Sequence, residues 1–390
     1  MNINLYTQIM RMKKYLILAL TAAIAAVGCS KTFEVVPTPT DSNPIGFGTW
    51  ANTLTKASHA TGNVFNDGEA FDVYGNKTVS SSPVVVFDGD DVTYTSSTAK
   101  WDYTTKRFWD PTATQYTFFA VLPAGNLANE ASAGAYATGG LFTSNDITFS
   151  DPTSYTNDIL VADKTVVTPT GSAGSYVYTN PVQMDFNHAA SRVDFKVKQD
   201  AALGASAVVT VTDLSLINIH NKGHFTVSAY ANSAPYKPTV GWDEAQTPTT
   251  LGTEGVYSIL SSVSIEAGGQ TVYDTDADPD ADNDVSGSAV ALFTDYVFMP
   301  QTITTAVQKL RISYTITIGN EVSTFTNKEF DLYDFMTTDS NDNSEGSHIA
   351  AWAPNTHYTY YLTIGANAIS FTATIKNWEA STSGYQYLLK

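Results

Sequence analysis

Short runs of β-branched and aromatic residues recur along this chain from residue 45 onward, and apolar and polar positions alternate within them. The clearest runs are residues 71–74, 116–122, 192–197, 208–216 and 310–318. Clusters of Gly, Asn, Asp and Pro separate the runs, and alternation with a period of two is typical of half-buried strands. Because many short strands with polar turns favour sandwiches, we predict an all-β fold built from β-sandwiches.

The chain is long enough for more than one hydrophobic core. Its 390 residues, even without an export segment at the N-terminus, exceed the usual size of a single domain. A cluster of Pro, Gly and Ser at residues 169–175 separates two strand-rich halves. We therefore predict two tandem β-sandwich domains, which cover residues 45–175 and 176–390.

Residues 1–28 have the features of a secretory signal peptide. A basic start is followed by an apolar run at residues 15–27, and Gly28 then precedes Cys29. The apolar run is shorter than the roughly 20 residues that a membrane-spanning helix needs. Gly28-Cys29 looks like a bacterial lipobox, in which Cys29 carries the lipid; the alternative is an ordinary signal peptide beside an unrelated cysteine. Residues 29–44 have the polar, Pro-rich composition of a tether.

The chain is strongly acidic, with 38 Asp and Glu residues against 20 Lys and Arg. Removal of the signal peptide takes away three basic residues and no acidic ones, so the net charge changes from −18 to −21. Because phosphate backbones repel such a polyanion, we expect no nucleic-acid binding. Anionic lipid head groups repel it too, so the membrane link would be the acyl chains on the N-terminal cysteine.

Acidic residues alternate in a segment that begins with Asp274, Asp276 and Asp278. Carboxylate oxygens suit Ca²⁺, but an EF-hand loop needs Gly at its sixth position and Glu at its twelfth. Counted from Asp274, those positions hold Pro279 and Val285. A solvated acidic loop is the simpler interpretation, and the three aspartates are weak metal candidates.

Catalytic motifs are missing from the sequence. It contains no Gly-x-Ser-x-Gly nucleophile elbow, no phosphate-binding P-loop and no Gly-x-Gly-x-x-Gly dinucleotide fingerprint. Carboxylates occur throughout so acidic a chain, so their pairing does not single out a glycosidase site. We expect a protein that is not an enzyme and that holds no cofactor.

Aromatic residues gather in the first half, at Trp101, Tyr103, Trp109, Tyr116 and Phe118. Strand alternation places Trp101 and Tyr103 on one face, and Tyr116 and Phe118 on one face of a later strand. Such rings either fill a core or form a platform that stacks on sugars. In a structural subunit these rings would be buried, whereas in a glycan-binding protein two or more of them would line an open, flat surface.

These features together resemble the fimbrillins, the lipoprotein subunits of type V pili in Gram-negative bacteria. Each matching piece consists of ordinary residues, and the order of the pieces along nearly the whole chain carries the resemblance. They include Gly28-Cys29, Ile45-x-Phe47, Thr55-Lys56-Ala57, Gly68-x-x-Phe71-x-Val73-Tyr74-Gly75, Tyr116-x-Phe118-x-Ala120-x-x-Pro123, Asn187-His188-Ala189-Ala190-Ser191-Arg192 and Trp352-x-Pro354-Asn355.

The resemblance implies two transthyretin-like β-sandwich domains and assembly by strand addition. In this family a trypsin-like protease cuts near the first strand, and a strand from a neighbouring subunit fills the groove that opens. Lys56 is the candidate cleavage site, because the arm from Cys29 to residue 60 holds no arginine; a plain strand end is the alternative. The candidate donor strand consists of the alternating residues Tyr385, Tyr387 and Leu389 near the C-terminus.

The expected function is that of a structural, tip or accessory subunit of cell-surface fimbriae that contributes to adhesion. Expected partners are other fimbrial subunits, joined by strand exchange, the outer membrane, reached through the lipid on Cys29, and ligands on host or bacterial surfaces. The short segment after Trp378 favours a tip or accessory role, because a stalk subunit of this family would carry a longer tail. A glycan-binding surface lipoprotein of the outer membrane is the alternative.

Overall fold

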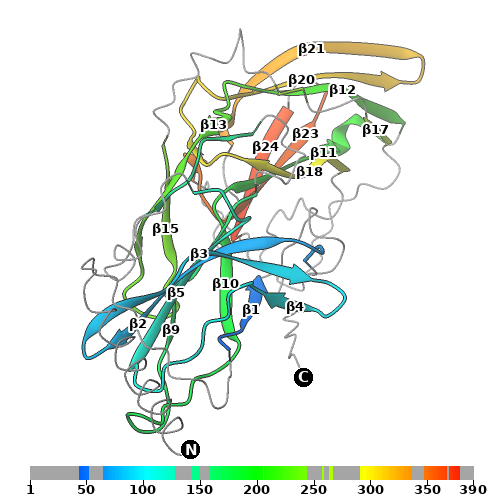
Figure 1. Cartoon of the computed structure of the whole chain (residues 1–390). Helices are drawn as coiled ribbons and strands as arrows, with labels where there is room; N and C mark the ends of the chain where they lie inside the picture. The colour runs from blue at the N-terminus through cyan, green and yellow to red at the C-terminus, as the bar shows by residue number, and fades with distance from the viewer. Residues whose placement is uncertain are drawn as a thin grey trace, which may run out of the picture. The chain divides into compact units, whose positions relative to one another are not determined.

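The computed structural model describes residues 44–51, 65–127, 142–149, 158–204, 206–243, 257–258, 263–266, 290–335, 347–366 and 369–377. Within these ranges the chain forms β-strands and two short 3₁₀ turns, Ala201–Leu203 (η2) and Leu332–Asp334 (η5), and no α-helix. The predicted all-β class is confirmed (Figure 1). None of the described segments is a helix long and apolar enough to cross a membrane.

The first sheet has eight strands and closes on itself. It contains β1 (Phe47–Ala51), β2 (Ala70–Val79), β3 (Ser82–Thr95), β4 (Lys100–Asp102), β5 (Gln115–Leu122), β8 (Leu160–Ala162), β9 (Thr165–Val167) and β10 (Val182–His188). Their order is β2-β3-β4-β1-β10-β8-β5-β9, and β2 also pairs with β5. This additional pairing joins the two sides of the sheet into a ring, which leaves an enclosed space for an apolar core.

Aromatic side chains fill the ring. Alternate residues of β5, including Tyr116 and Phe118, point into this core and are buried. Their neighbours Phe119 and Val121 point the other way and join a separate buried cluster. Because side chains of a strand alternate between its faces, β5 serves two cores at once, and this explains why the run reads as almost continuously apolar in the sequence.

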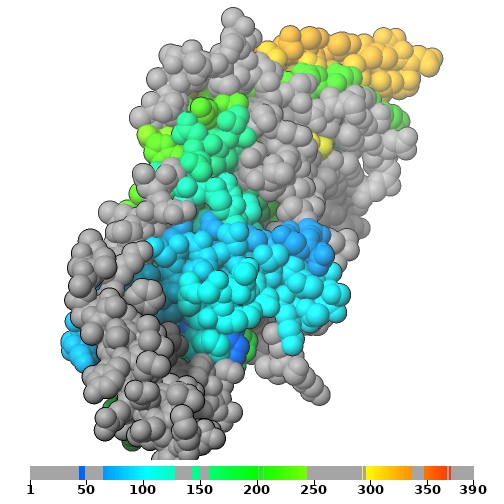
Figure 2. Space-filling view, viewed as in Figure 1, coloured from blue at the N-terminus to red at the C-terminus, as the bar shows by residue number. Residues whose placement is uncertain are grey.

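Two further sheets form a sandwich in the second half of the chain. One contains β18 (Val290–Phe298), β11 (Ser191–Gln199), β23 (Thr356–Ile364) and β24 (Ile369–Asn377) in that order. The other contains β16 (Tyr257–Ser258), β12 (Ala207–Ile217), β20 (Lys309–Ile318) and β21 (Glu321–Asp331), and β17 (Val263–Glu266) also pairs with β12. Residues of β11, β23, β12 and β20 share one buried core. The edge strand β21 is mostly exposed, and its hairpin with β20 forms part of the surface in Figure 2.

Shorter strands connect the two halves. β6 (Phe142–Thr143) pairs with β14 (Phe225–Tyr230), which also pairs with β15 (Pro238–Trp242), and β7 (Ile147–Thr148) pairs with β13 (Lys222–Gly223). β19 (Gln301–Thr302) and β22 (Ala351–Trp352) form a separate two-stranded pair. A third buried cluster contains residues of β2 and β5 together with residues of β14 and β18. The halves are therefore interleaved by these pairings and by the shared cluster.

The chain passes from the first sheet to the sandwich at Ala189 and Ala190, which have no exposed surface. The Trp242 indole N–H donates to the Ala189 carbonyl at 2.6 Å, and the Asn355 N–H donates to the Ala190 carbonyl at 3.0 Å. β10, which precedes this passage, belongs to the first sheet. The division into domains at residues 175 and 176 and the transthyretin-like architecture of each domain stay predictions.

Candidate functional site

β1 occupies a seam in the first sheet, between β4 and β10 (Figure 1). It pairs with β10 in parallel over five residues, from Phe47 opposite Val182 to Ala51 opposite Phe186. Toward β4 it has a single pair, Phe47 opposite Trp101. The ring is thus closed through a strand that is short, lies early in the sequence and has few backbone pairings on one side.

Two inward side chains anchor this segment in the aromatic core. Ile45 is 0% exposed and Phe47 is 2% exposed. The Phe47 ring makes edge contacts at ring-centroid distances of 5.3 Å to Phe87, 5.8 Å to Phe118, 5.9 Å to Tyr103 and 6.0 Å to Phe71. Burial of one Phe side chain is worth about 1.5–3 kcal/mol, and good aromatic pairs add to it. Phe47 therefore holds β1 in place more firmly than the backbone pairing with β4 does.

Asn180 binds the backbone of this segment from the β10 side. Its Oδ1 accepts the Gly46 N–H at 2.7 Å, and its Nδ2 donates to the Pro44 carbonyl at 3.0 Å. The N–H of Val182, at the start of β10, donates to the Gly46 carbonyl at 2.8 Å. The Asn180 amide thus supplies the donor and the acceptor that one more residue of a neighbouring strand would supply.

The opposite side of the segment is bound by the stretch that follows β4. The Ile45 N–H donates to the Arg107 carbonyl at 2.9 Å, and the Tyr103 hydroxyl donates to the Ile45 carbonyl at 2.8 Å. Burial raises the pKa of the Tyr103 phenol, so the group stays an O–H donor at neutral pH. Backbone groups of the segment are therefore bound from both sides, and backbone groups are present in any peptide sequence.

The aromatic residues that suggested two functions are core residues. Trp101 is 8% exposed, Tyr103 is 6% exposed, and Tyr116 and Phe118 have no exposed surface. Trp109 is partly buried and stacks on Tyr178 at 4.6 Å with an interplanar angle of 7°. These rings do not form an open, flat platform. This is the arrangement that the pilus-subunit hypothesis predicts.

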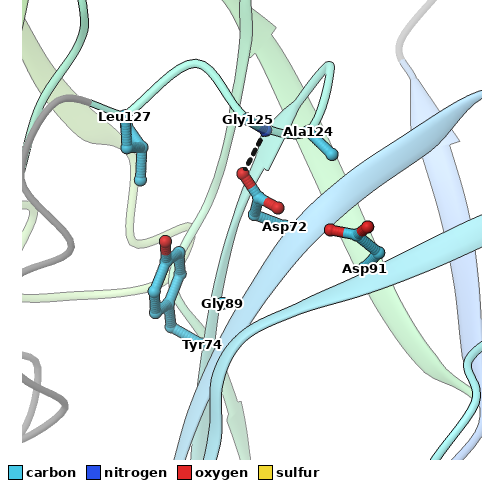
Figure 3. Close-up of a pocket in the computed structure, with 7 residues that line it drawn as sticks. All are labelled: Asp72, Tyr74, Gly89, Asp91, Ala124, Gly125 and Leu127. Atoms are coloured by element: carbon cyan, nitrogen blue, oxygen red, sulfur yellow. Dashed lines mark hydrogen bonds between the residues drawn. The ribbon is translucent and has the colours of Figure 1, made fainter.

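A pocket of about 240 Å³ lies on the outer side of the first sheet (Figure 3). Its lining consists of Asp72, Tyr74, Gly89, Asp91, Ala124, Gly125 and Leu127. Asp72 is buried and its Oδ2 accepts the Gly125 N–H at 2.7 Å, and Asp91 is its cross-strand partner on β3. The described parts of the chain hold no group of three or more potential metal ligands.

The residues proposed from the sequence as sites fall outside the described ranges. These are Cys29, Lys56, the weak metal candidates Asp274, Asp276 and Asp278, and the donor-strand residues Tyr385, Tyr387 and Leu389. Their roles stay predictions. The sequence contains one usable sign of the β1 seam, because the strand-like runs begin at residue 45 and the Ile45-x-Phe47 pattern belongs to the pieces that resemble the fimbrillins. It contained no sign that Asn180, 134 residues away from Gly46, would bind it.

The fold is thus that of an all-β protein with a closed aromatic core, a sandwich and an N-terminal strand set in a seam. A crystal structure of a fimbrial protein from Bacteroides vulgatus has the same fold, with 22% sequence identity and a TM-score of 0.51, over 86% of this chain and 99% of that chain. A candidate cell adhesion protein from Bacteroides uniformis matches at 14% identity and a TM-score of 0.42, over 87% of this chain and 99% of that one. The tip fimbrial protein Mfa3 from Porphyromonas gingivalis, with a C-terminal truncation, matches at 11% identity and a TM-score of 0.38. The match covers 80% of this chain and 95% of that one.

The model of the fimbrillin-like family matches residues 55–378. This chain belongs to the fimbrillin-like family, and the resemblance inferred from the sequence is confirmed. The sequence has no match among curated proteins. Family and fold together are those of fimbrial proteins.

Proposed function

We propose that this chain is a subunit of cell-surface fimbriae that joins a neighbour by strand addition at the β1 seam. The observation that carries the proposal is the placement of β1, a five-residue strand that closes the ring and inserts Phe47 into its core. Departure of β1 would leave an open ladder along β10 and an apolar slot. A strand from another subunit would pair with the backbone of β10 and fill the apolar slot, because it supplies backbone hydrogen bonds and alternating side chains.

The position of Lys56 supports this function. Lys56 follows β1 in the sequence and precedes β2, which begins at Ala70. A cut after Lys56 would separate β1, together with the tether and the lipidated Cys29, from the rest of the subunit. A single proteolytic step would then release the subunit from the outer membrane and free the seam for a partner strand.

The remaining parts of the proposal concern location and role. The subunit is exported as a lipoprotein, is held in the outer membrane through Cys29 and reaches the cell surface in a fimbrium. We assign it a tip or accessory role, a contribution to adhesion and no enzymatic activity. Because Trp101, Tyr103, Tyr116 and Phe118 are buried, these four residues offer the glycan-binding alternative no platform.

The test uses the mature chain with a recognition site for a sequence-specific protease inserted after Lys56. After cleavage, a fluorescein-labelled peptide of residues 44–51 is added in excess, and its uptake is followed by fluorescence anisotropy. The cut chain should exchange its own β1 for the peptide, whereas the uncut chain should not. A peptide with Phe47→Ser is the matched control and should bind much more weakly. Absence of peptide uptake by a folded, cut chain would refute strand addition at this seam.

Two smaller experiments address maturation. Limited trypsin digestion should cut the wild-type chain between β1 and β2 and should leave a Lys56→Gln variant uncut at that place, as intact-mass measurement will show.

A Cys29→Ala variant expressed in a Gram-negative host should lose membrane association and the incorporation of labelled palmitate. Retention of both by the variant would refute lipidation at Cys29.

A further inference from the structure

Glycines alternate with the anchors of the β1 segment, in the order Ile45-Gly46-Phe47-Gly48. Ile45 and Phe47 point into the core, so Gly46 and Gly48 face the outer side of the ring. A Cβ atom at position 46 would lie 3.2 Å from Asn180 Oδ1, and one at position 48 would lie 2.7 Å from Gln183 Nε2. Side chains from the β10 side of the seam therefore cover both outward positions.

The two positions differ in how readily their neighbours move. Gln183 is exposed and its amide lies at the end of a flexible side chain, so it can swing away from a small substituent at position 48. Asn180 is held by both of its amide atoms, which bind the backbone at Pro44 and Gly46. Displacing Asn180 would break the bonds that position the strand. Position 46 is therefore the strict one and position 48 the tolerant one.

We infer that the seam selects its partner strand by this pattern: a bulky apolar residue, a glycine, a second bulky apolar residue and then a small residue. The inference rests on the proposed strand addition and specifies the chemistry of the incoming strand. Asn180 is the residue that tests it, because its Oδ1 accepts the Gly46 N–H and would lie only 3.2 Å from a Cβ atom at position 46. Ile45 and Phe47 mark the two inward pockets that the partner must fill.

The C-terminal segment of this chain does not fit the pattern. When two neighbouring residues among Tyr385, Tyr387 and Leu389 fill both inward pockets, Gln386 or Leu388 takes the position of Gly46. When Gly384 takes that position instead, the small polar Ser383 falls in the Ile45 pocket. If the segment is shifted by one residue, so that Tyr385 and Tyr387 take the outward positions, these two side chains would lie against Asn180 and Gln183. The strand that enters the seam therefore comes from a different subunit and not from the C-terminal segment of a second copy. Such an acceptor forms a defined junction between unlike subunits.

The test compares labelled peptides on the cut full-length chain described above. They are residues 44–51 with the natural sequence, the same peptide with Gly46→Gln, the same peptide with Gly48→Ala, and residues 381–390. We expect the Gly46→Gln peptide to bind at least about tenfold more weakly than the natural peptide, since it loses the Asn180 bonds. The Gly48→Ala peptide should bind within about threefold of the natural one, and the C-terminal peptide should not compete.

An Asn180→Ala acceptor supplies the decisive comparison. It should bind the natural peptide more weakly, and it should lose most of its preference for the natural peptide over the Gly46→Gln peptide, because the group that discriminates has been removed. An unchanged preference would overturn the role of Asn180, even if the variant is merely less stable.

The outcomes separate this inference from the function on which it rests. Uptake of the natural and the Gly46→Gln peptides with equal affinity would overturn the pattern and leave strand addition standing. Tight binding of the C-terminal peptide would overturn the inference that the partner is a different subunit. Failure of every peptide, including the natural one, would overturn both the proposed function and the pattern.

Discussion

Replacement of Phe47 by alanine should strongly destabilise the first half of the chain. The Phe47 ring is 2% exposed and contacts four other aromatic rings at centroid distances of 5.3–6.0 Å. Alanine removes the buried ring and leaves a cavity that rigid aromatic neighbours fill poorly, and such changes cost about 3–5 kcal/mol. That is a large share of the roughly 5–15 kcal/mol by which folded proteins are stable.

Urea unfolding followed by tryptophan fluorescence and far-UV circular dichroism measures this loss. The expected result is a transition midpoint that falls strongly while the slope of the transition stays the same. Val177→Ala is the matched control, since Val177 is 66% exposed and its truncation should change the free energy of unfolding by no more than about 0.5 kcal/mol. The same variant tests function, because a weakly anchored β1 should exchange faster with added peptide after cleavage.

A loss below about 1 kcal/mol for Phe47→Ala would refute this reasoning. It would mean that β1 contributes little to the ring, and the seam would then offer a partner strand little binding energy. A strong loss of stability with no change in the rate of strand exchange would refute the functional part alone.

Three further predictions follow from the same region. Asn180→Ala removes two hydrogen bonds to the backbone of the β1 segment and should lower the free energy of unfolding by about 1–3 kcal/mol, as urea titration will measure. Gly46→Ala forces a contact with Asn180 and should lower the free energy of unfolding by about 1–3 kcal/mol. Gly241→Ala is the control and should leave the free energy of unfolding unchanged, because a Cβ atom there meets no atom within 4 Å. Equal effects of the two substitutions would exclude a close-packing role for Gly46. Burial raises the pKa of Tyr178 from 10.0 to about 12, so the folded chain holds the phenol proton more tightly than the unfolded chain does. The contribution of this proton to the free energy of unfolding is therefore fully present below pH 10 and is lost as the pH rises toward 12. The urea midpoint of Tyr178→Phe should therefore fall less than that of the wild type over this range, and parallel curves would contradict the assignment.

Much of the secondary structure could be predicted from the sequence, because the relevant signals are local. The apolar runs at residues 71–74, 116–122 and 192–197 lie within β2, β5 and β11. β-branched and aromatic residues with period-two alternation are reliable signs of a pleated surface with a buried face. The sequence leaves two interpretations of the aromatic residues, a buried core and an exposed platform. The burial of these residues in the folded chain shows that they belong to the core.

Pairings between distant segments could not be predicted. Closure of the first sheet depends on β2 pairing with β5 and on β1 pairing in parallel with β10, and neither partner is marked by any local pattern. The Gly/Ser/Pro cluster at residues 169–175 is a local sign from which a boundary is predicted, whereas the passage of the chain from the first sheet to the second core at Ala189 and Ala190 has no such sign. Glycine usually weakens a strand prediction. The sequence therefore does not predict that Asn180 lies close to Gly46 within a strand segment.

The buried cluster that both halves share couples events at the seam to the sandwich. Tyr74 and Phe119 of the first sheet lie in the same cluster as Val297 of β18 and Phe225 of β14. Alternate residues of β5 lie in the ring core and in this shared cluster, so a displacement of β5 that follows opening of the ring would uncover apolar surface in both. A partner strand that fills the seam would thereby raise the stability of the whole subunit, and a vacant seam would lower it. If a neighbour adds its strand at the seam as proposed, its binding and the resistance of the subunit to unfolding would report on one equilibrium.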